Sequence, residues 1–278
     1  MDSHDAPETR HDAAALSERS DQSAFAELMR SVVPGLTDRQ IEQLMTYRDM
    51  LHARNQVVNL TAVRDFEGIE RRLVLESLRL LDRVRVLAAS DAPRIMDLGS
   101  GGGIPGVVLA IAMPEATFTL LDATGKKVAF LQDCIDEIGL PHARAVHGRA
   151  EELAHQLEWR GAFDVVTARA VTSLSALLEL GLPFVRINGW LALPKGPEID
   201  DELKIAAKAA SKLGGTITEA SFLPHVGSLV DTRLVLVRKE SPTPGHFPRR
   251  AGLPARAPLG SEHDRPDKRV RRGKSKRS

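Results

Sequence analysis

The sequence predicts an α/β fold in which a mostly parallel sheet of seven strands follows an N-terminal helical region. From Arg94 onwards, short apolar runs alternate with amphipathic stretches. Strands that alternate with helices in this way are typical of βαβ units and a parallel sheet. Before that point, apolar residues recur at helical spacing, and residues 1–93 hold only two glycines.

The N-terminal part divides into two predicted segments. Residues 1–23 are polar and acidic, and we expect them to be disordered. Residues 24–92 form the helical region. Its first clear helix begins at a capping box, Thr37 to Gln40, and has an apolar face with Ile41, Leu44, Met45 and Leu51. A second helical stretch, FEGIERRLVLESLRLLDRV, follows the segment VVNLTAVRD.

The predicted sheet domain covers residues 93–240. Its strands are RIMDL, ATFTLLD, RAVHG, FDVVTAR, GWLALP, GTITEASFLP and TRLVLVRKE. Its helices are IPGVVLAIAM, KKVAFLQDCIDEIGL, LSALLELGLPFV and EIDDELKIAAKAASKLG. Right-handed crossovers place the carboxyl ends of the parallel strands at one edge of the sheet, where ligands bind.

Length and composition limit the class of protein. The 278 residues suffice for one large domain or two small ones. No apolar run reaches the roughly 20 residues of a membrane span, and the N-terminus lacks the pattern of a signal peptide. Cys134 is the single cysteine, which excludes internal disulfides and cysteine-cluster metal sites. We therefore expect a cytoplasmic monomer with no membrane or metal partner.

The net charge of +1 conceals a basic tail at residues 241–278. The tail holds 11 Lys and Arg against 3 Asp and Glu, whereas the preceding residues hold 27 against 34. Its six prolines and four glycines predict a disordered segment without regular structure. A basic tail on an acidic body suggests a polyanionic partner; a solvated tail without a partner is the alternative.

The stretch DLGSGGGIPG, residues 97–106, lies where the first strand of the sheet turns into its first helix. Glycine lets backbone N–H groups approach a ligand, and a helix N-terminus favours negative charge. No Gly-Lys-Ser/Thr follows, which argues against a phosphate loop. Gly101, Gly103 and Gly106 do satisfy the dinucleotide pattern G-x-G-x-x-G, so an NAD site is one interpretation.

Two aspartates favour S-adenosylmethionine over NAD. Asp97 ends the first strand, where its carboxylate suits a cofactor with an ammonium group better than a pyrophosphate. Asp122 ends the next strand, 23 residues after Gly99. A carboxylate there can accept both ribose hydroxyls, a feature that NAD sites share. The combination resembles the site of Rossmann-like methyltransferases, and an NAD-dependent oxidoreductase is the alternative.

Seven motifs appear in order: NLTAVRD, MDLGSGGGIPGVVLAI, FTLLDATGKKVAFLQ, GRAEEL, FDVVTARAVTSL, LPKG and LVLVRK. They resemble the ribosomal RNA small subunit methyltransferase G family, also called glucose-inhibited division protein B, over about residues 36–259. The resemblance implies methyl transfer from S-adenosylmethionine to N7 of a guanine in the 530 loop of 16S rRNA, guanine 527 in customary numbering. It implies 16S rRNA or the small ribosomal subunit as the partner; another RNA or a small molecule is the alternative substrate.

The resemblance also implies positions for the site residues. The implied cofactor contacts are Gly99, Gly101, Ile104, Asp122, Ala150, Glu151 and Arg169. Asp122 would hold the ribose, and Ala150 with Glu151 would meet the adenine. Arg169 lies at the strand edge where the donor methyl and the target base should meet. Lys195, in LPKG, is a candidate for a phosphate contact, with a solvated loop lysine as the alternative.

The N-terminal region offers candidate RNA contacts and two departures from the family. The candidates are Asn59, Arg64 and Arg72. For Asn59, and for Thr61 close to it, a turn and helix cap is the alternative. Where the family has a histidine and an aspartate in an R-H-x-L-D-S pattern, this chain has Leu73 and Glu76. If the histidine of relatives contacts RNA, that contact is missing here, and a non-catalytic RNA-binding protein is a further alternative.

Methylation at guanine N7 needs no general base, because N7 carries a lone pair and no proton. The enzyme must place the base in line with the methyl group and tolerate the positive charge that develops. The sequence accordingly shows no catalytic dyad. Arg169 is a candidate donor to guanine O6; a structural role or a contact with the cofactor carboxylate is the alternative.

Overall fold

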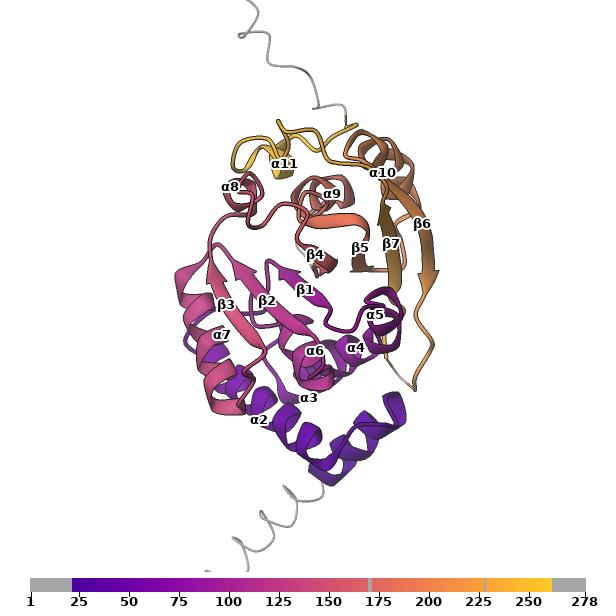
Figure 1. Ribbon diagram of the computed structural model, residues 1–278. Helices are drawn as coiled ribbons and strands as arrows, with labels where there is room; N and C mark the ends of the chain where they lie inside the picture. Colours follow the sequence, from indigo (N-terminus) through magenta and orange to yellow (C-terminus); the bar gives the residue numbers. More distant parts are fainter. Residues whose placement is uncertain (1–21, 170–171, 228, 262–278) are drawn as a thin grey trace, which may run out of the picture.

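The computed structural model describes residues 22–169, 172–227 and 229–261 (Figure 1). The predicted disordered N-terminus lies outside these residues except for its last two, which belong to a helix at 22–32. Residues 262–278 of the basic tail also lie outside them. Within the described ranges, no helix has the length and apolar character needed to cross a membrane. The same ranges hold no group of three or more side chains arranged to bind a metal ion.

The region before the sheet is helical. Helix α2 (Asp38–Asn55) begins at the predicted capping box, where the Gln40 N–H donates to the Thr37 hydroxyl (3.3 Å) and the Thr37 N–H donates to the Gln40 side chain (3.0 Å). The second predicted helix is a broken run of four pieces. These are α3 (Phe66–Gly68), the π-helix η1 (Ile69–Leu75), α4 (Glu76–Leu78) and α5 (Leu81–Leu87).

All seven predicted strands form one sheet, in the order β3-β2-β1-β4-β5-β7-β6. They are β1 (Arg94–Leu98), β2 (Thr117–Asp122), β3 (Ala143–His147), β4 (Phe163–Thr167), β5 (Val185–Lys195), β6 (Gly215–Phe222) and β7 (Arg233–Lys239). Strand β1 pairs in parallel with β2 and β4, whereas β7 runs antiparallel to both β5 and β6. The prediction of a mostly parallel, Rossmann-like sheet is confirmed.

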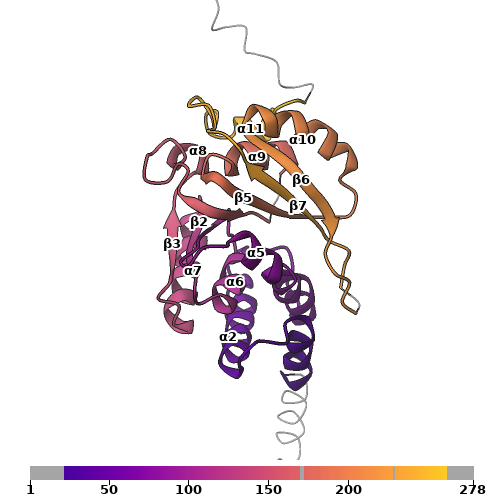
Figure 2. The same cartoon turned by 45° about the vertical axis from the view of Figure 1, so that its right-hand side comes forward.

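Alternate residues of the central strands enter two different cores. Ile95 and Val165 join the core under the N-terminal helices, α6 (Gly106–Ala112) and α7 (Gly125–Ile138). Their neighbours Met96 and Val166 join the core under α8 (Ala150–Leu153), α9 (Leu174–Gly181) and α10 (Asp200–Lys212). Helices therefore cover both faces of the sheet (Figures 1 and 2), which explains why its central strands are continuous apolar runs.

The first part of the basic tail differs from our prediction of a disordered segment. Residues 242–261 pack over α9 and contain the short helix α11 (Leu253–Arg256) (Figure 1). Phe247 and Leu259 are buried in the core on that face of the sheet. Proline and glycine exclude long helices and strands, but they do not prevent a chain from burying isolated apolar side chains. Composition alone therefore misjudged this segment.

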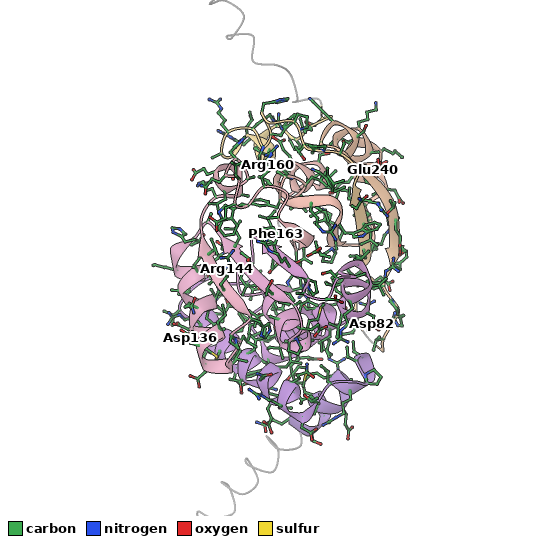
Figure 3. The ribbon with its side chains drawn as sticks, viewed as in Figure 1. Asp82, Asp136, Arg144, Arg160, Phe163 and Glu240 are labelled. Carbon is green, nitrogen blue, oxygen red and sulfur yellow. The ribbon has the colours of Figure 1, made fainter. Side chains whose placement is uncertain are left out.

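Charged side chains of the sheet domain anchor the same segment. Arg249 forms an ion pair with the fully buried Glu179 (2.7 Å). Arg160, labelled in Figure 3, donates to the carbonyls of Thr243 (2.7 Å) and Phe247 (3.0 Å). Arg249 is thus a partner for an internal carboxylate.

The strand order places a ligand edge beside β1. From β1 the chain proceeds outward to β2 and β3 on one side, and then returns to β4 on the other side. Open α/β sheets bind ligands at such a switch point, beyond the carboxyl ends of the strands. The glycine-rich loop follows β1 at this edge, and Arg169 follows β4 at the same edge.

Candidate active site

The glycine-rich loop bends back over the end of β2. The N–H groups of Gly99 and Ser100 both donate to the Leu121 carbonyl, at 2.8 and 3.0 Å. Gly99 and Gly103 have φ angles of 70° and 94°, which favour glycine. A Cβ atom at Gly103 would lie 2.5 Å from a side chain of α6, whereas one at Gly99 would meet nothing within 4 Å. Gly103 is needed for packing, and Gly99 faces open space.

Asp97 secures the loop from within the protein. It is fully buried, and it accepts hydrogen bonds from the Gly106 N–H (3.0 Å) and from the Thr167 hydroxyl (3.1 Å). Burial raises the pKa of this carboxyl to about 6, and the negative charge of Asp122 acts in the same direction. The position differs from our expectation that Asp97 meets a cofactor ammonium group, since a fully buried carboxylate cannot reach one.

Asp122 orients the outer part of the loop. Its two carboxylate oxygens accept the N–H groups of Gly101 (2.9 Å) and Thr124 (2.8 Å). A carboxylate oxygen has two lone pairs, so each oxygen keeps one acceptor site. The side chain is largely buried but retains some exposure at the end of β2. Asp122 therefore combines a fixed orientation with remaining acceptor capacity.

A cavity of about 650 Å³ opens beside the loop. Gly99, Gly101 and Ile104 line it from the loop, and Arg169 lines it from the end of β4. The N-terminal region supplies the opposite wall, which consists of Asn59, Leu60, Thr61, Ala62, Arg64 and Leu73. The fold thus joins four predicted cofactor positions and two predicted RNA positions in one space.

Ala150 and Glu151 lie apart from this cavity, in α8. Neither residue lines it, nor the smaller cavity described below. One carboxylate oxygen of Glu151 accepts the N–H of Gly252 (2.8 Å), which belongs to the packed part of the tail. The tail therefore contacts the side chain that the family resemblance assigns to the adenine.

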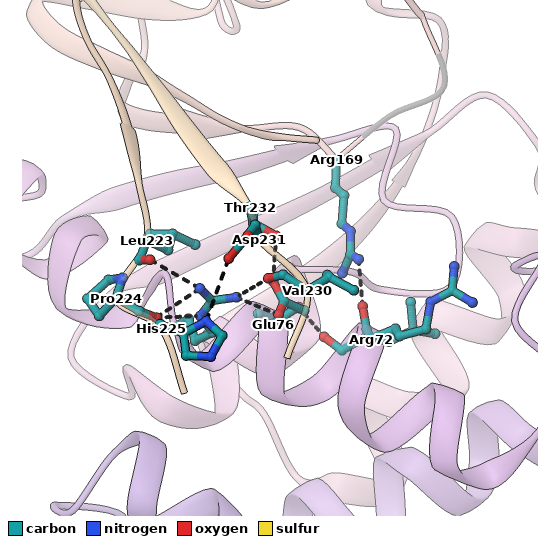
Figure 4. A network of polar contacts seen from close by, with 12 residues as sticks. Arg72, Glu76, Arg169, Leu223, Pro224, His225, Val230, Asp231 and Thr232 are labelled. Carbon is teal, nitrogen blue, oxygen red and sulfur yellow. Dashed lines mark hydrogen bonds and ion pairs between the residues drawn. The ribbon is translucent and has the colours of Figure 1, made fainter. Parts of the chain in front are cut away.

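Arg169 lies between two cavities. Its guanidinium donates to the Arg72 carbonyl in η1 at 2.5 Å (Figure 4). Burial lowers the pKa of Arg169, and the carboxylate of Glu76 opposes that effect. The residue lines the larger cavity and also a smaller one of about 330 Å³. Among the residues that line these two cavities, Arg169 alone is common to both.

The smaller cavity lies at the carboxyl end of β5. Lys195 lines it together with Arg169, so the two candidate catalytic residues face the same space. The Lys195 ammonium group forms an ion pair with Glu202 (3.0 Å) and lies 3.5 Å from the Thr172 carbonyl. Lys195 is therefore a partly buried and partnered cation rather than a solvated loop lysine.

The two departures from the family pattern have different positions. Leu73 is buried and forms an apolar part of the larger cavity wall. Glu76 is also buried, and its carboxylate accepts hydrogen bonds from Arg79 (2.6 Å) and from the Thr232 hydroxyl (2.7 Å) (Figure 4). Glu76 thus joins the N-terminal region to the segment before β7.

The RNA candidates lie on the exposed rim. Arg64 donates to the Asn59 side chain (2.7 Å), and both residues are exposed at the mouth of the larger cavity. Arg72 is exposed as well. The hydroxyl of the neighbouring Thr61 accepts the Val63 N–H (3.2 Å), so the NLTAVRD segment also makes the local turn contacts that we considered as the alternative.

Sequence reasoning missed several residues of these cavities, among them Lys127, Asp231 and Thr232. Lys127 lines the larger cavity, and its place in the GKK motif was a signal to which we assigned no role. Asp231 and Thr232 line the smaller cavity, and they precede β7 without any recognisable motif. Their proximity to Arg169 arises from strand order, which local sequence does not reveal.

Comparison with known proteins assigns this site to a family. The model of the GidB family, described as rRNA small subunit methyltransferase G, matches residues 40–227. The chain belongs to the GidB family. Its relatives include two proteins named Ribosomal RNA small subunit methyltransferase G. The one from Clostridium novyi is 36% identical, and the match covers 80% of this chain and 90% of the relative. The one from Roseiflexus castenholzii is 42% identical, and the match covers 81% of this chain and 94% of the relative. Among solved structures, the CurJ carbon methyltransferase is similar with a TM-score of 0.48 at 14% identity, covering 86% of this chain and 72% of that one.

As a GidB family member, the chain is a methyltransferase, and its cofactor is S-adenosylmethionine, as predicted. The alternative of an NAD-dependent oxidoreductase is thereby set aside. The geometry fits the cofactor. No atom lies within 4 Å of the place where a Cβ at Gly99 would be, so a ligand can approach the backbone closely there. The adjoining cavity of about 650 Å³ falls within the usual size range for small-molecule sites.

Proposed function

We propose that this protein transfers a methyl group from S-adenosylmethionine to N7 of a guanine in the 530 loop of 16S rRNA, guanine 527 in customary numbering. Family membership and the printed names of the relatives support ribosomal RNA of the small subunit as the substrate. The structural observation that carries the proposal is the position of Arg169, in the wall between the two cavities. One cavity adjoins the glycine loop, and the other is free to receive a base.

The cofactor supplies an electrophilic sulfonium methyl group. We assign its binding to the residues that the family motif indicates: Gly99, Gly101, Ile104, Asp122, Ala150, Glu151 and Arg169. The backbone of Gly99 and Gly101 permits close approach, and Asp122 offers free lone pairs for ribose hydroxyls. Glu151 keeps one carboxylate oxygen free of the Gly252 contact, and that oxygen is available to the adenine amine.

The chain's part in the chemistry is positioning and electrostatics. Guanine N7 attacks through its own lone pair, so no residue has to remove a proton. Arg169 donates to guanine O6 and leaves N7 free, because a bidentate contact to O6 and N7 would block attack. The carboxylate of Glu76, which lines the smaller cavity, counters the positive charge that develops on the methylated base.

RNA contacts surround this site in our proposal. Asn59, Arg64 and Arg72 lie on the exposed side of the N-terminal region, and Lys195 lies in the smaller cavity. Phosphate contacts from such cations give salt-dependent affinity that is independent of base sequence. The target base must leave its stack to enter the cavity. We further propose a cytoplasmic monomer that acts without a metal ion.

The proposal is tested with purified protein, radiolabelled S-adenosylmethionine and small ribosomal subunits from a strain that lacks the enzyme. Borohydride and aniline treatment cleaves RNA at 7-methylguanosine. We expect methyl incorporation and one cleavage in the 530 loop. Incorporation without that cleavage would move the target to another position or RNA. Cofactor binding without any incorporation would favour a non-catalytic RNA-binding protein.

A further inference from the structure

The smaller cavity is formed where two antiparallel strands meet. Lys195 at the end of β5 is the register partner of Arg233 at the start of β7. Residues just after Lys195 therefore lie beside residues just before Arg233. The cavity walls come from these two segments, 194–197 and 230–232, together with Glu76, Leu80 and Arg169. The space has a volume of about 330 Å³ and shares one lining residue, Arg169, with the cofactor cavity.

The segment before β7 is held by a buried ion pair. Arg79 and Glu76 pair at 2.6 Å, and both side chains are almost completely buried. Arg79 also donates to the carbonyls of Pro224 (2.8 Å) and Val230 (2.9 Å), and Glu76 accepts from Thr232 (2.7 Å) (Figure 4). The backbone on both sides of Asp231 is thereby fixed to the N-terminal region.

Asp231 lies between these two anchored neighbours. Its side chain is 65% exposed, and it lines the cavity. Its ionic neighbour is the imidazole of His225 at 3.6 Å, also exposed, which is a charged partner only when protonated. A carboxylate on a fixed backbone that is not engaged in a strong ion pair is preorganised to accept hydrogen bonds from a ligand.

We propose that the smaller cavity binds the flipped target guanine and that Asp231 accepts hydrogen bonds from guanine N1–H and the N2 amine. This inference rests on the proposed function. The Watson–Crick edge of guanine presents two adjacent N–H donors, which match the two oxygens of one carboxylate. Adenine has an unprotonated N1 at the corresponding place, so the same carboxylate would repel it.

The orientation agrees with attack by N7. In guanine, N7 lies on the imidazole ring, on the opposite side of the base from N1 and N2. A base whose N1 and N2 contact Asp231 therefore directs N7 away from that residue. Arg169 is the lining residue that the smaller cavity shares with the cofactor cavity, so N7 directed toward Arg169 faces the methyl donor. Asp231, at one end of the smaller cavity, thus determines which base is bound, and Arg169, at the other end, lies where N7 meets the methyl donor.

The test compares two substrates and several variants in single-turnover methylation. One substrate is small subunits reconstituted with guanosine at the target position, and the other has inosine there, which lacks the N2 amine. We expect the wild-type rate to be roughly 10- to 100-fold lower with inosine. The Asp231→Ala variant should lose more than this factor with guanosine, because both contacts are removed, and less with inosine, because only the N1–H contact is left to lose. Asp231→Asn keeps an acceptor oxygen and should retain part of the rate.

The matched control is Asp91→Asn, an exposed carboxylate just before β1 at the opposite edge of the sheet, which should behave as wild type. Equal losses for Asp231→Ala on both substrates would show that the carboxylate acts elsewhere, and unchanged rates would show that it has no role; either result overturns the inference while leaving the proposed function intact. Absence of N7 methylation by the wild-type protein would overturn both. Because Asp231 is exposed, thermal melting of its variants should match that of the wild type.

Discussion

The Arg169 guanidinium donates a 2.5 Å hydrogen bond to the carbonyl of Arg72, 97 residues earlier in the chain. Arg72 belongs to η1, a π-helical stretch, and such stretches frequently occur at functional sites. The contact joins the end of β4 to the N-terminal region at the wall between the two cavities. One interaction therefore both docks the helical region and fixes the side chain that we place between cofactor and base.

Replacement of Arg169 by alanine should lower the single-turnover rate of rRNA methylation about 100-fold, because it removes a preorganised donor next to the reacting atoms. Arg169→Lys keeps the charge but has a shorter reach and no planar fork, and we expect it to recover only part of the rate. The measurement uses saturating S-adenosylmethionine and small subunits. Thermal melting controls for folding, and an alanine variant with undiminished turnover would contradict the role.

Gly99→Ala should weaken cofactor binding more than it weakens folding. Gly99 has a φ of 70°, so alanine there costs about 1 kcal/mol of backbone strain, and the added methyl group points into open space beside the cavity. Gly139, after α7, has a φ of 74° and equally open surroundings. The Gly139→Ala variant should therefore show a similar loss of stability, measured by urea unfolding, with an unchanged Kd for S-adenosylmethionine by calorimetry. Equal Kd values for the two variants would remove Gly99 from the site.

Asp97→Asn should change how stability depends on pH. Burial raises the pKa of Asp97 from 3.8 to about 6, so between these values the folded chain holds a proton that the unfolded chain has released. The contribution of this group to the free energy of unfolding is therefore greatest below about pH 4 and falls as pH rises through 6. A shift of this size corresponds to about 3 kcal/mol. Urea unfolding of wild type and variant from pH 4 to 7 measures the difference, which should vary with pH by that order.

Arg249→Ala should destabilise the protein strongly, because the completely buried carboxylate of Glu179 would lose its cationic partner. Removal of one member of a buried ion pair costs about 3–5 kcal/mol. The adjacent Arg250 is exposed, and Arg250→Ala provides the matched control with an expected change below about 0.5 kcal/mol. Similar midpoints of urea unfolding for the two variants would show that the ion pair between Arg249 and Glu179 does not contribute to stability.

Much of the site was predictable because its determinants are local. The glycines after β1, the acidic residue that ends β2 and the capping box at Thr37 are short patterns with direct physical meaning, and all appear where the sequence placed them. The tail was not predictable from composition, because its burial depends on Glu179 and Arg160, which lie far away in the sequence.

The sequence by itself determined the seven strands, the glycine loop and the motifs of a methyltransferase family, since each depends on neighbouring residues and their spacing. Only the tertiary structure decided that Asp97 lies beneath the loop, that Arg169 separates two cavities, and that Glu76 and Arg79 hold the segment around Asp231. These relationships join residues from different strands and from the N-terminal helices. They follow from strand order and packing, which no single stretch of sequence encodes.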